Sequence, residues 1–154
     1  MKVASGRALA RFALALTLLG PARVMPAGEF EPALWSRLDR IESAFRNGDA
    51  QALRASLPEN AKVRVDLRTL ADGPVSYGPG QLQVVLDHIF HDQPTREFVL
   101  PRRQVKVSSP GTAFASGRWV RGRRPGAPDA LDLVTMTLRE DGGDWHIYEI
   151  LCSR

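Results

Sequence analysis

The sequence predicts an α+β domain in which a bent antiparallel sheet wraps around N-terminal helices and a central helix. Three observations carry this prediction. Apolar residues recur at helical spacing early in the chain, apolar and polar residues alternate in its second half, and turn residues separate the alternating runs. The 154 residues fit one domain. An order of helices followed by strands is typical of α+β folds.

Two helices are expected over residues 31–57. The apolar side chains of the first are Leu34, Leu38, Ile41 and Phe45, and they fall on one helical face. Asn47-Gly48 is expected to end this helix. Asp49 is a suitable N-cap for a second, short helix, which Pro58 ends.

A strand and a third helix follow. Residues 61–70 alternate apolar and polar side chains, which predicts a half-buried strand with Asp66 on its exposed, polar face. Asp72-Gly73-Pro74 indicates a turn. Gly78-Pro79-Gly80 then opens a helix over residues 81–92, whose apolar stripe is Leu82, Val85, Leu86, Ile89 and Phe90.

The rest of the chain is expected to form strands. They are predicted over residues 97–100, 103–109, 112–122, 131–141 and 144–152. Pro110-Gly111 and Asp141-Gly142-Gly143 indicate turns, and residues 123–130 a longer hairpin loop.

The first 27 residues are typical of a secretory signal peptide. Lys2, Arg7 and Arg11 precede a short apolar run, Gly20-Pro21 breaks it, and small residues follow up to Ala27. The apolar run is shorter than the roughly 20 residues that span a bilayer. We therefore expect a signal peptide over residues 1–27, one domain over residues 28–154, no transmembrane segment, and a secreted or periplasmic location.

Charge and cysteine content exclude several classes of function. The chain has 21 Lys and Arg against 17 Asp and Glu, but four of the basic residues lie in the predicted leader. The remaining chain is balanced, so its composition gives no reason to expect nucleic-acid binding. The single cysteine excludes an intrachain disulfide and any multi-cysteine metal site.

Four stretches, taken in order, resemble the nuclear-transport-factor-2-like superfamily, and more closely an uncharacterised secreted bacterial branch of it. They are residues 44–53 (AFRNGDAQAL), 76–90 (SYGPGQLQVVLDHIF), 115–122 (ASGRWVRG) and 145–151 (WHIYEIL). The resemblance implies a cone-shaped fold with a pocket at its wide end, and a homodimer formed through the sheet. Some members of the superfamily are enzymes and many have no established activity, so the fold does not fix the function.

Four aromatic side chains are the candidates for lining an apolar pocket. They are Trp119, Tyr77, Trp145 and Phe98. Trp119 is the strongest, because Ala113, Ala115 and Gly117 share its strand face and leave space beside it. Each of the four aromatic residues could equally fill the core.

Catalysis in such a cone needs acid and base groups inside it. The available groups are Tyr77, Asp66, His88, Tyr148, His146 and Glu149. Strand alternation places Glu149 on the same face as Trp145 and Ile147, hence inward, unless a bulge intervenes. No pair of these groups matches a known catalytic pair, so we assign no catalytic residue.

Two further clusters have ordinary explanations. His88, His91 and Asp92 share a helix face and could bind a metal, but no second cluster supplies further ligands. Residues 96–124 hold eight basic residues and one acid, which could form a basic surface or only a solvated sheet face. We therefore expect no metal and no cofactor.

The sequence favours a secreted module that binds a small apolar or amphipathic ligand, or a protein partner, without catalysis. An isomerase- or cyclase-like enzyme using the same cone is the first alternative. A purely structural dimer module is the second.

Overall fold

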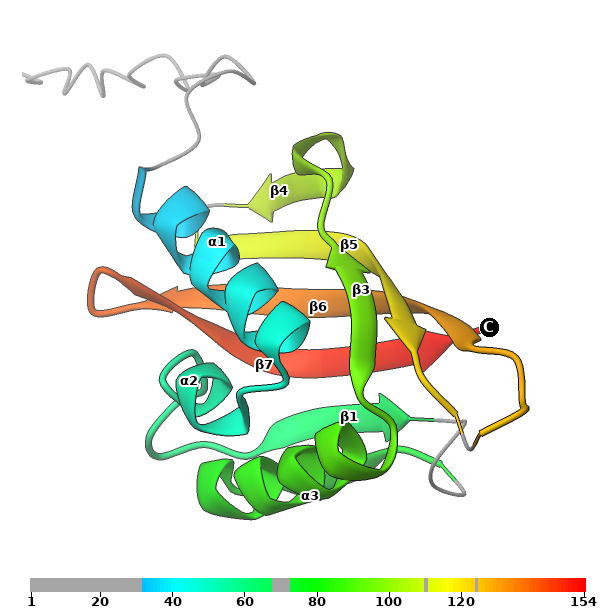
Figure 1. Ribbon diagram of the computed structural model, residues 1–154. Coiled ribbons are helices and arrows are strands. Elements are labelled where there is room, and N and C mark those ends of the chain that lie inside the picture. The colour runs from blue at the N-terminus through cyan, green and yellow to red at the C-terminus, as the bar shows by residue number, and fades with distance from the viewer. Residues whose placement is uncertain (1–31, 68–72, 110, 124) are drawn as a thin grey trace, which may run out of the picture.

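The computed structural model describes residues 32–67, 73–109, 111–123 and 125–154. Within them, the chain forms a curved sheet with three α-helices on one face (Figure 1). The predicted leader lies outside the described residues, as does Asp72 of the predicted turn. The elements in chain order are α1 (Pro32–Asn47), α2 (Ala50–Arg54), β1 (Val63–Leu67), β2 (Val75–Tyr77), α3 (Pro79–Asp92), β3 (Thr95–Val99), the 3₁₀ turn η1 (Arg102–Gln104), β4 (Val105–Ser109), β5 (Thr112–Arg121), β6 (Ala130–Asp141) and β7 (Asp144–Ser153).

The helix ends follow the local chemistry that the sequence indicates. α1 ends before Gly48, whose φ of 63° lies in the left-handed region that favours glycine. Asp49 caps α2, because its Oδ1 accepts a hydrogen bond of 2.8 Å from the backbone N–H of Ala52. α3 begins at Pro79, where the missing N–H costs no helical hydrogen bond. The three predicted helices are confirmed.

The sheet runs in the order β2-β1-β7-β6-β5-β3, and β4 pairs with the same edge of β5 as β3 does. The pairs are antiparallel except β1 with β7, which run parallel. The predicted strands are present. β2 was not predicted, because three residues are too few to show an alternating pattern.

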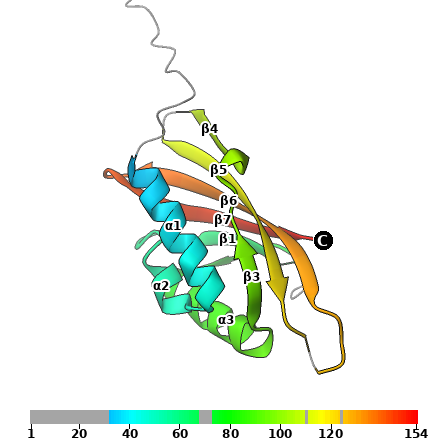
Figure 2. The same ribbon diagram turned by 45° about the horizontal axis from the view of Figure 1, so that its top comes forward.

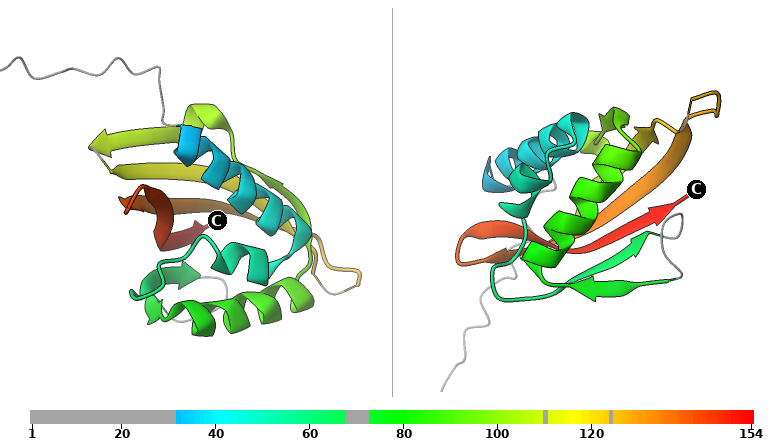
Figure 3. Two further views of the ribbon diagram at one scale, coloured as in Figure 1. Left: turned by 90° about the vertical axis from the view of Figure 1, so that its left-hand side faces the viewer. Right: turned by 60° about the horizontal axis from the view of Figure 1, so that its bottom comes forward.

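The three α-helices cover what we call the inner face of the sheet, and the sheet bends around them (Figures 2 and 3). Inward side chains alternate with outward ones along β5 and β6. Leu86 and Ile89 of α3 are buried against this core, as the apolar stripe predicts. The opposite face of the sheet carries no helix, and we call it the outer face. No helix among the described residues has the length and apolar composition to cross a bilayer.

A β-bulge changes the alternation of β7. Leu138 of β6 pairs with Ile147 and Thr137 pairs with Glu149, so Tyr148 is an extra residue. Before the bulge the odd-numbered positions Trp145 and Ile147 are buried, and after it the even-numbered positions Ile150 and Cys152 are. Glu149 therefore does not face inward. The sequence predicted an inward Glu149 only if no bulge intervened, and a bulge is present.

Candidate functional site

The space between helices and sheet is filled at Trp119 by a cluster of four aromatic rings. Phe45 of α1 stacks on Phe98 of β3 with ring centroids 4.5 Å apart. Trp119 of β5 meets Phe45 edge-on at 5.3 Å and Phe90 of α3 at 5.8 Å. All four rings are buried. Trp119 and Phe98, which the sequence offered as ligand-binding residues, are therefore brought together as neighbours in the core.

The small residues beside Trp119 do not leave an open space. A Cβ added at Gly117 would lie 2.8 Å from the carbonyl oxygen of Val99 and 3.2 Å from Cζ of Phe98. The glycine is thus required for the close approach of β3. The expectation of space beside Trp119 is corrected here. Its physical reason is that the sequence could not show which strand would cross over these small side chains.

A buried ion pair lies next to the cluster. Nε of Arg121 donates a hydrogen bond of 2.9 Å to Oδ2 of Asp132, and Nη2 of Arg121 forms an ion pair with the same oxygen. Nη1 of Arg121 donates a hydrogen bond of 2.7 Å to Oε1 of Gln93. The guanidinium also lies over the ring of Trp119, 4.8 Å from the centroid. Arg121 is therefore a core residue and not part of a basic surface.

Other polar groups lie close to this pair. Nε1 of Trp119 donates a hydrogen bond of 2.9 Å to Oγ1 of Thr95.

Burial, with the negative charge of Asp132 as a smaller cause, raises the pKa of the Cys152 thiol to about 12. Because the thiolate is the reactive form of cysteine, Cys152 is chemically inert here.

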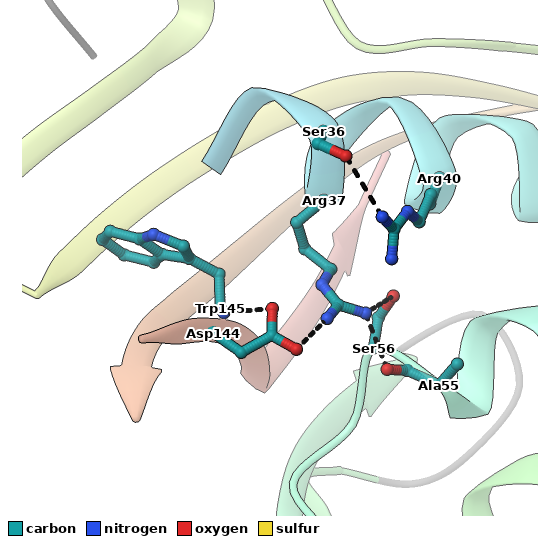
Figure 4. A network of polar contacts seen from close by, with 7 residues as sticks. All are labelled: Ser36, Arg37, Arg40, Ala55, Ser56, Asp144 and Trp145. Atoms are coloured by element: carbon teal, nitrogen blue, oxygen red, sulfur yellow. Dashed lines mark hydrogen bonds and ion pairs between the residues drawn. The ribbon is translucent and has the colours of Figure 1, made fainter. Parts of the chain in front are cut away.

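Tyr77 and Trp145, the other two proposed ligand-binding residues, lie apart from this cluster. Tyr77 ends β2 at one edge of the sheet and packs half-buried against the core. Trp145 is buried near the start of β7, beside a polar network that joins three parts of the chain (Figure 4). Trp119 and Phe98 thus share one aromatic cluster, while Tyr77 and Trp145 come from β2 and the start of β7.

The network beside Trp145 centres on Arg37, a buried residue of α1 that the sequence analysis did not single out. Arg37 donates to the carbonyl of Ala55 at 2.7 Å and forms an ion pair with Asp144, the first residue of β7 (Figure 4). The hydrogen bond from Arg37 holds the pKa of Asp144 below its usual value. Arg37 lies on the buried face of α1, where the helical pattern predicts an apolar side chain. Because its side chain is polar, the apolar pattern gives no signal for its burial.

Three of the acid and base candidates, His88, Glu149 and Asp66, lie on different elements of the fold. His88 lies exposed on α3, where its Nδ1 is 2.8 Å from the carbonyl oxygen of Val84. Glu149 lies on the outer face, where it accepts hydrogen bonds of 3.1 Å from Arg64 and from Thr137. Asp66 is a correction, because it is 8% exposed and not on an exposed face. Near the end of β1 it lies directly beside Leu151 of β7.

The residues of the possible metal cluster and of the basic segment also have defined places in the structure. His88, His91 and Asp92 are exposed, and no group of metal-ligating side chains occurs among the described residues. The basic segment does not form one surface, because Arg121 points inward while Arg118 forms an ion pair with Glu97 on the outer face. Arg102 is placed near Asp39 of α1, at 3.8 Å.

An open groove of about 490 Å³ lies on the outer face, where β5 and β6 run beside the end of β3. It is lined by the apolar residues Leu131 and Leu133, which are 57% and 47% exposed and so among the most exposed large apolar side chains described. The rest of the lining is three arginines, Arg103, Arg118 and Arg154, together with Val99, Pro101, Gln104 and Asp132. We call this the outer-face groove. The sequence analysis did not find it, although two leucines in the polar phase of an alternating strand are a signal that could have.

A second hollow runs along the exposed surface of α1. It is lined by Pro32, Trp35, Ser36, Asp39, Arg40 and Ser43. One helix supplies all of these residues, so no converging side chains from other elements form a site.

The fold can be compared with known proteins. No protein-family model and no curated protein matches the sequence. A DUF4783 family protein from Bacteroides uniformis matches in structure with a TM-score of 0.62 at 14% identity, over 75% of this chain and 94% of its own. An NTF2-like protein of unknown function from Shewanella oneidensis matches with a TM-score of 0.55 at 17% identity, over 79% of this chain and 97% of its own.

The chain has the nuclear-transport-factor-2-like fold. A member of the NTF2-like family from Streptomyces avermitilis, whose name proposes a dehydratase, has the same fold with a TM-score of 0.60 at 17% identity, over 79% of this chain and 93% of its own. The resemblance read from the four sequence stretches is confirmed. Identities this low show the fold alone, so the nuclear-transport-factor-2-like fold leaves the function to be argued from the site.

Proposed function

We propose that the protein is a non-catalytic binding module and that the outer-face groove is its binding site. The observation that carries the proposal is the exposure of Leu131 and Leu133 in the lining of a groove. Apolar side chains that are exposed side by side, with polar residues around them, are typical of interaction sites and ligand-binding grooves. The aromatic cluster around Trp119 fills the corresponding part of the interior.

Binding is favoured over an isomerase- or cyclase-like activity by the distribution of the titratable groups. General acid–base catalysis needs a donor or acceptor within hydrogen-bond reach of the reacting atoms in a shielded site. His88 and Glu149 belong to opposite sides of the sheet, and Glu149 is already held by Arg64 and Thr137. The outer-face groove offers apolar surface and arginines, which suit recognition.

Binding of the uncharged fluorescent probe N-phenyl-1-naphthylamine tests the proposal. The fluorescence of this probe rises when it leaves water for an apolar site. We expect saturable binding that Leu131→Ser and Leu133→Ser each weaken, because each removes apolar contact surface from the groove. Val84→Ser is the matched control, since Val84 is 55% exposed on α3, on the helix-bearing side of the sheet.

Equal binding by the leucine variants and the wild type would place the site elsewhere. Self-association through the sheet is the competing assignment for the same face, and it corresponds to the structural-dimer alternative. Sedimentation velocity separates the two. If the wild type is a dimer that Leu133→Ser dissociates, and the wild type binds no probe, the structural-dimer alternative would be right and the binding-module proposal wrong.

A further inference from the structure

The outer-face groove combines apolar side chains with three arginines, and the one carboxylate in its lining, Asp132, is buried and paired with Arg121. Leu131, Leu133 and Val99 supply apolar surface, and the guanidinium groups come from three different elements or connections. Arg103 is in η1, Arg118 is in β5, and Arg154 follows β7. Resting on the function proposed above, we propose that the ligand of this groove is a single-chain amphiphile with an acidic headgroup, such as a fatty-acid carboxylate.

The arginines carry the headgroup assignment. Neither Arg103 nor Arg154 forms an ion pair with another described residue, and both are exposed. Arg118 is held by Glu97, which fixes its side chain while leaving further N–H donors on the same guanidinium. A guanidinium presents a planar fork of donors that matches a carboxylate with two parallel hydrogen bonds. Unpaired arginines beside a groove are therefore suited to an anion.

The leucines and the size of the groove carry the single-chain assignment. Volumes of about 300 to 1,000 Å³ are typical of sites for small molecules, and this groove has about 490 Å³. Alternation along β6 places Leu131 and Leu133, which are two positions apart, on the same face, so an extended alkyl chain can contact both. Apolar contact along the chain and charge at one end are the two features of an acidic amphiphile.

Charge also decides against a second copy of this chain as the occupant. In a twofold dimer the same patch lies on both subunits and faces itself. Centred on this groove, such an interface would place the arginines of one copy against those of the other. An acidic ligand removes this repulsion, and a second copy does not.

The test compares one charged and one uncharged ligand of the same chain length. Dodecanoate, below its micellar concentration, is titrated calorimetrically into the purified protein in parallel with dodecanol. We expect dodecanoate to bind, and Arg103→Gln and Arg118→Gln each to weaken its binding about tenfold, as loss of a charge-assisted hydrogen bond implies. Binding of dodecanol and of N-phenyl-1-naphthylamine should change less than twofold. Arg54→Gln, an exposed arginine of α2, is the matched control.

The outcomes separate this proposal from the one on which it rests. If dodecanoate binding is unchanged in both arginine variants while Leu133→Ser weakens it, the groove is a binding site and the acidic headgroup is wrong. If neither dodecanoate nor the uncharged probe binds, the proposed function fails as well. Binding confined to vesicles of phosphatidylglycerol, or to an acidic peptide, would overturn the single-chain ligand in favour of a membrane or a protein.

Discussion

Trp119 has more burial, more ring contacts and more polar partners than a pocket-lining residue needs. Its indole contacts Phe45 and Phe90, donates to Thr95 and carries the guanidinium of Arg121 on its face. We expect Trp119→Ala to lower the free energy of unfolding by about 3–5 kcal/mol, the range for a buried aromatic residue replaced by alanine. Urea denaturation followed by circular dichroism measures it.

Trp119→Phe is the control for this experiment. It keeps a ring in the cluster and removes the hydrogen bond to Thr95. The loss should be clearly smaller than for alanine. A cost below about 1 kcal/mol for Trp119→Ala would show that the site tolerates a large void, as a true cavity does, and would return the interior to consideration as a ligand site.

Asp144 gives a pH-dependent contribution to stability. The hydrogen bond from Arg37 lowers the pKa of this carboxyl in the folded protein relative to the unfolded chain. A lowered folded pKa stabilises the fold above the unfolded value of 3.8, and this contribution is lost as the pH falls through the folded pKa. Asp144→Asn should therefore cost more at neutral pH than in acid. The cost is about 1 kcal/mol or less, because exposure of Asp144 screens the pair.

A double-mutant cycle with Arg37→Gln checks the cause. Unfolding by urea is measured for the four proteins at about pH 7, where the carboxyl is ionised, and at about pH 2.5, where more of it is protonated. The coupling between the two positions should be larger at the higher pH than at the lower one. A coupling that is equal at both would mean that Arg37 and Asp144 do not interact as an ion pair.

Among the elements, α3 depends on a single stripe of apolar residues. Leu86 lies in this stripe and is buried, while Val84, two residues earlier, is exposed. We expect Leu86→Ala to lower the free energy of unfolding by about 2–5 kcal/mol. Val84→Ala is the control and should stay within about 0.5 kcal/mol. Equal effects at the two positions would contradict the orientation of the helix.

Elements with a periodic pattern or a capping residue were predictable from sequence, and β2 was not. α1 and α3 show a helical stripe, and Asp49 marks the start of α2 with a cap that the structure contains. β2 has three residues and no pattern. Residue 148 is a bulge, which is an insertion relative to β6 and so is invisible in β7 alone.

At the scale of the molecule, the fold was predictable and the candidate site was not. Local patterns and the order of four stretches were enough for the nuclear-transport-factor-2-like fold. The outer-face groove depends on residues that are distant in sequence, from Val99 to Arg154, which only the sheet brings together. The core position of Arg121 had the same cause, since its partners Gln93 and Asp132 come from other segments.

We propose that residues 1–27 direct export of the protein. Lys2, Arg7 and Arg11 before a short apolar run and the break at Gly20-Pro21 support it. Expressed in a bacterial host with a periplasm, the protein should be recovered outside the cytoplasm with a new N-terminus between Arg23 and Glu31. N-terminal sequencing measures this. Exported protein that begins at Met1 or Lys2 would contradict the proposal.

The extra residue at Tyr148 shifts the alternation of buried and exposed positions along β7 by one residue. Up to Ile147 the buried positions are odd-numbered, and from Ile150 they are even-numbered. A distant relative without the insertion must carry its last apolar pair in the opposite phase. An ungapped alignment of such a pair would match Ile150 and Cys152 to solvent-facing positions and lower the apparent identity of the strand. A sequence comparison with such a relative therefore needs a gap at residue 148 to align the last strand.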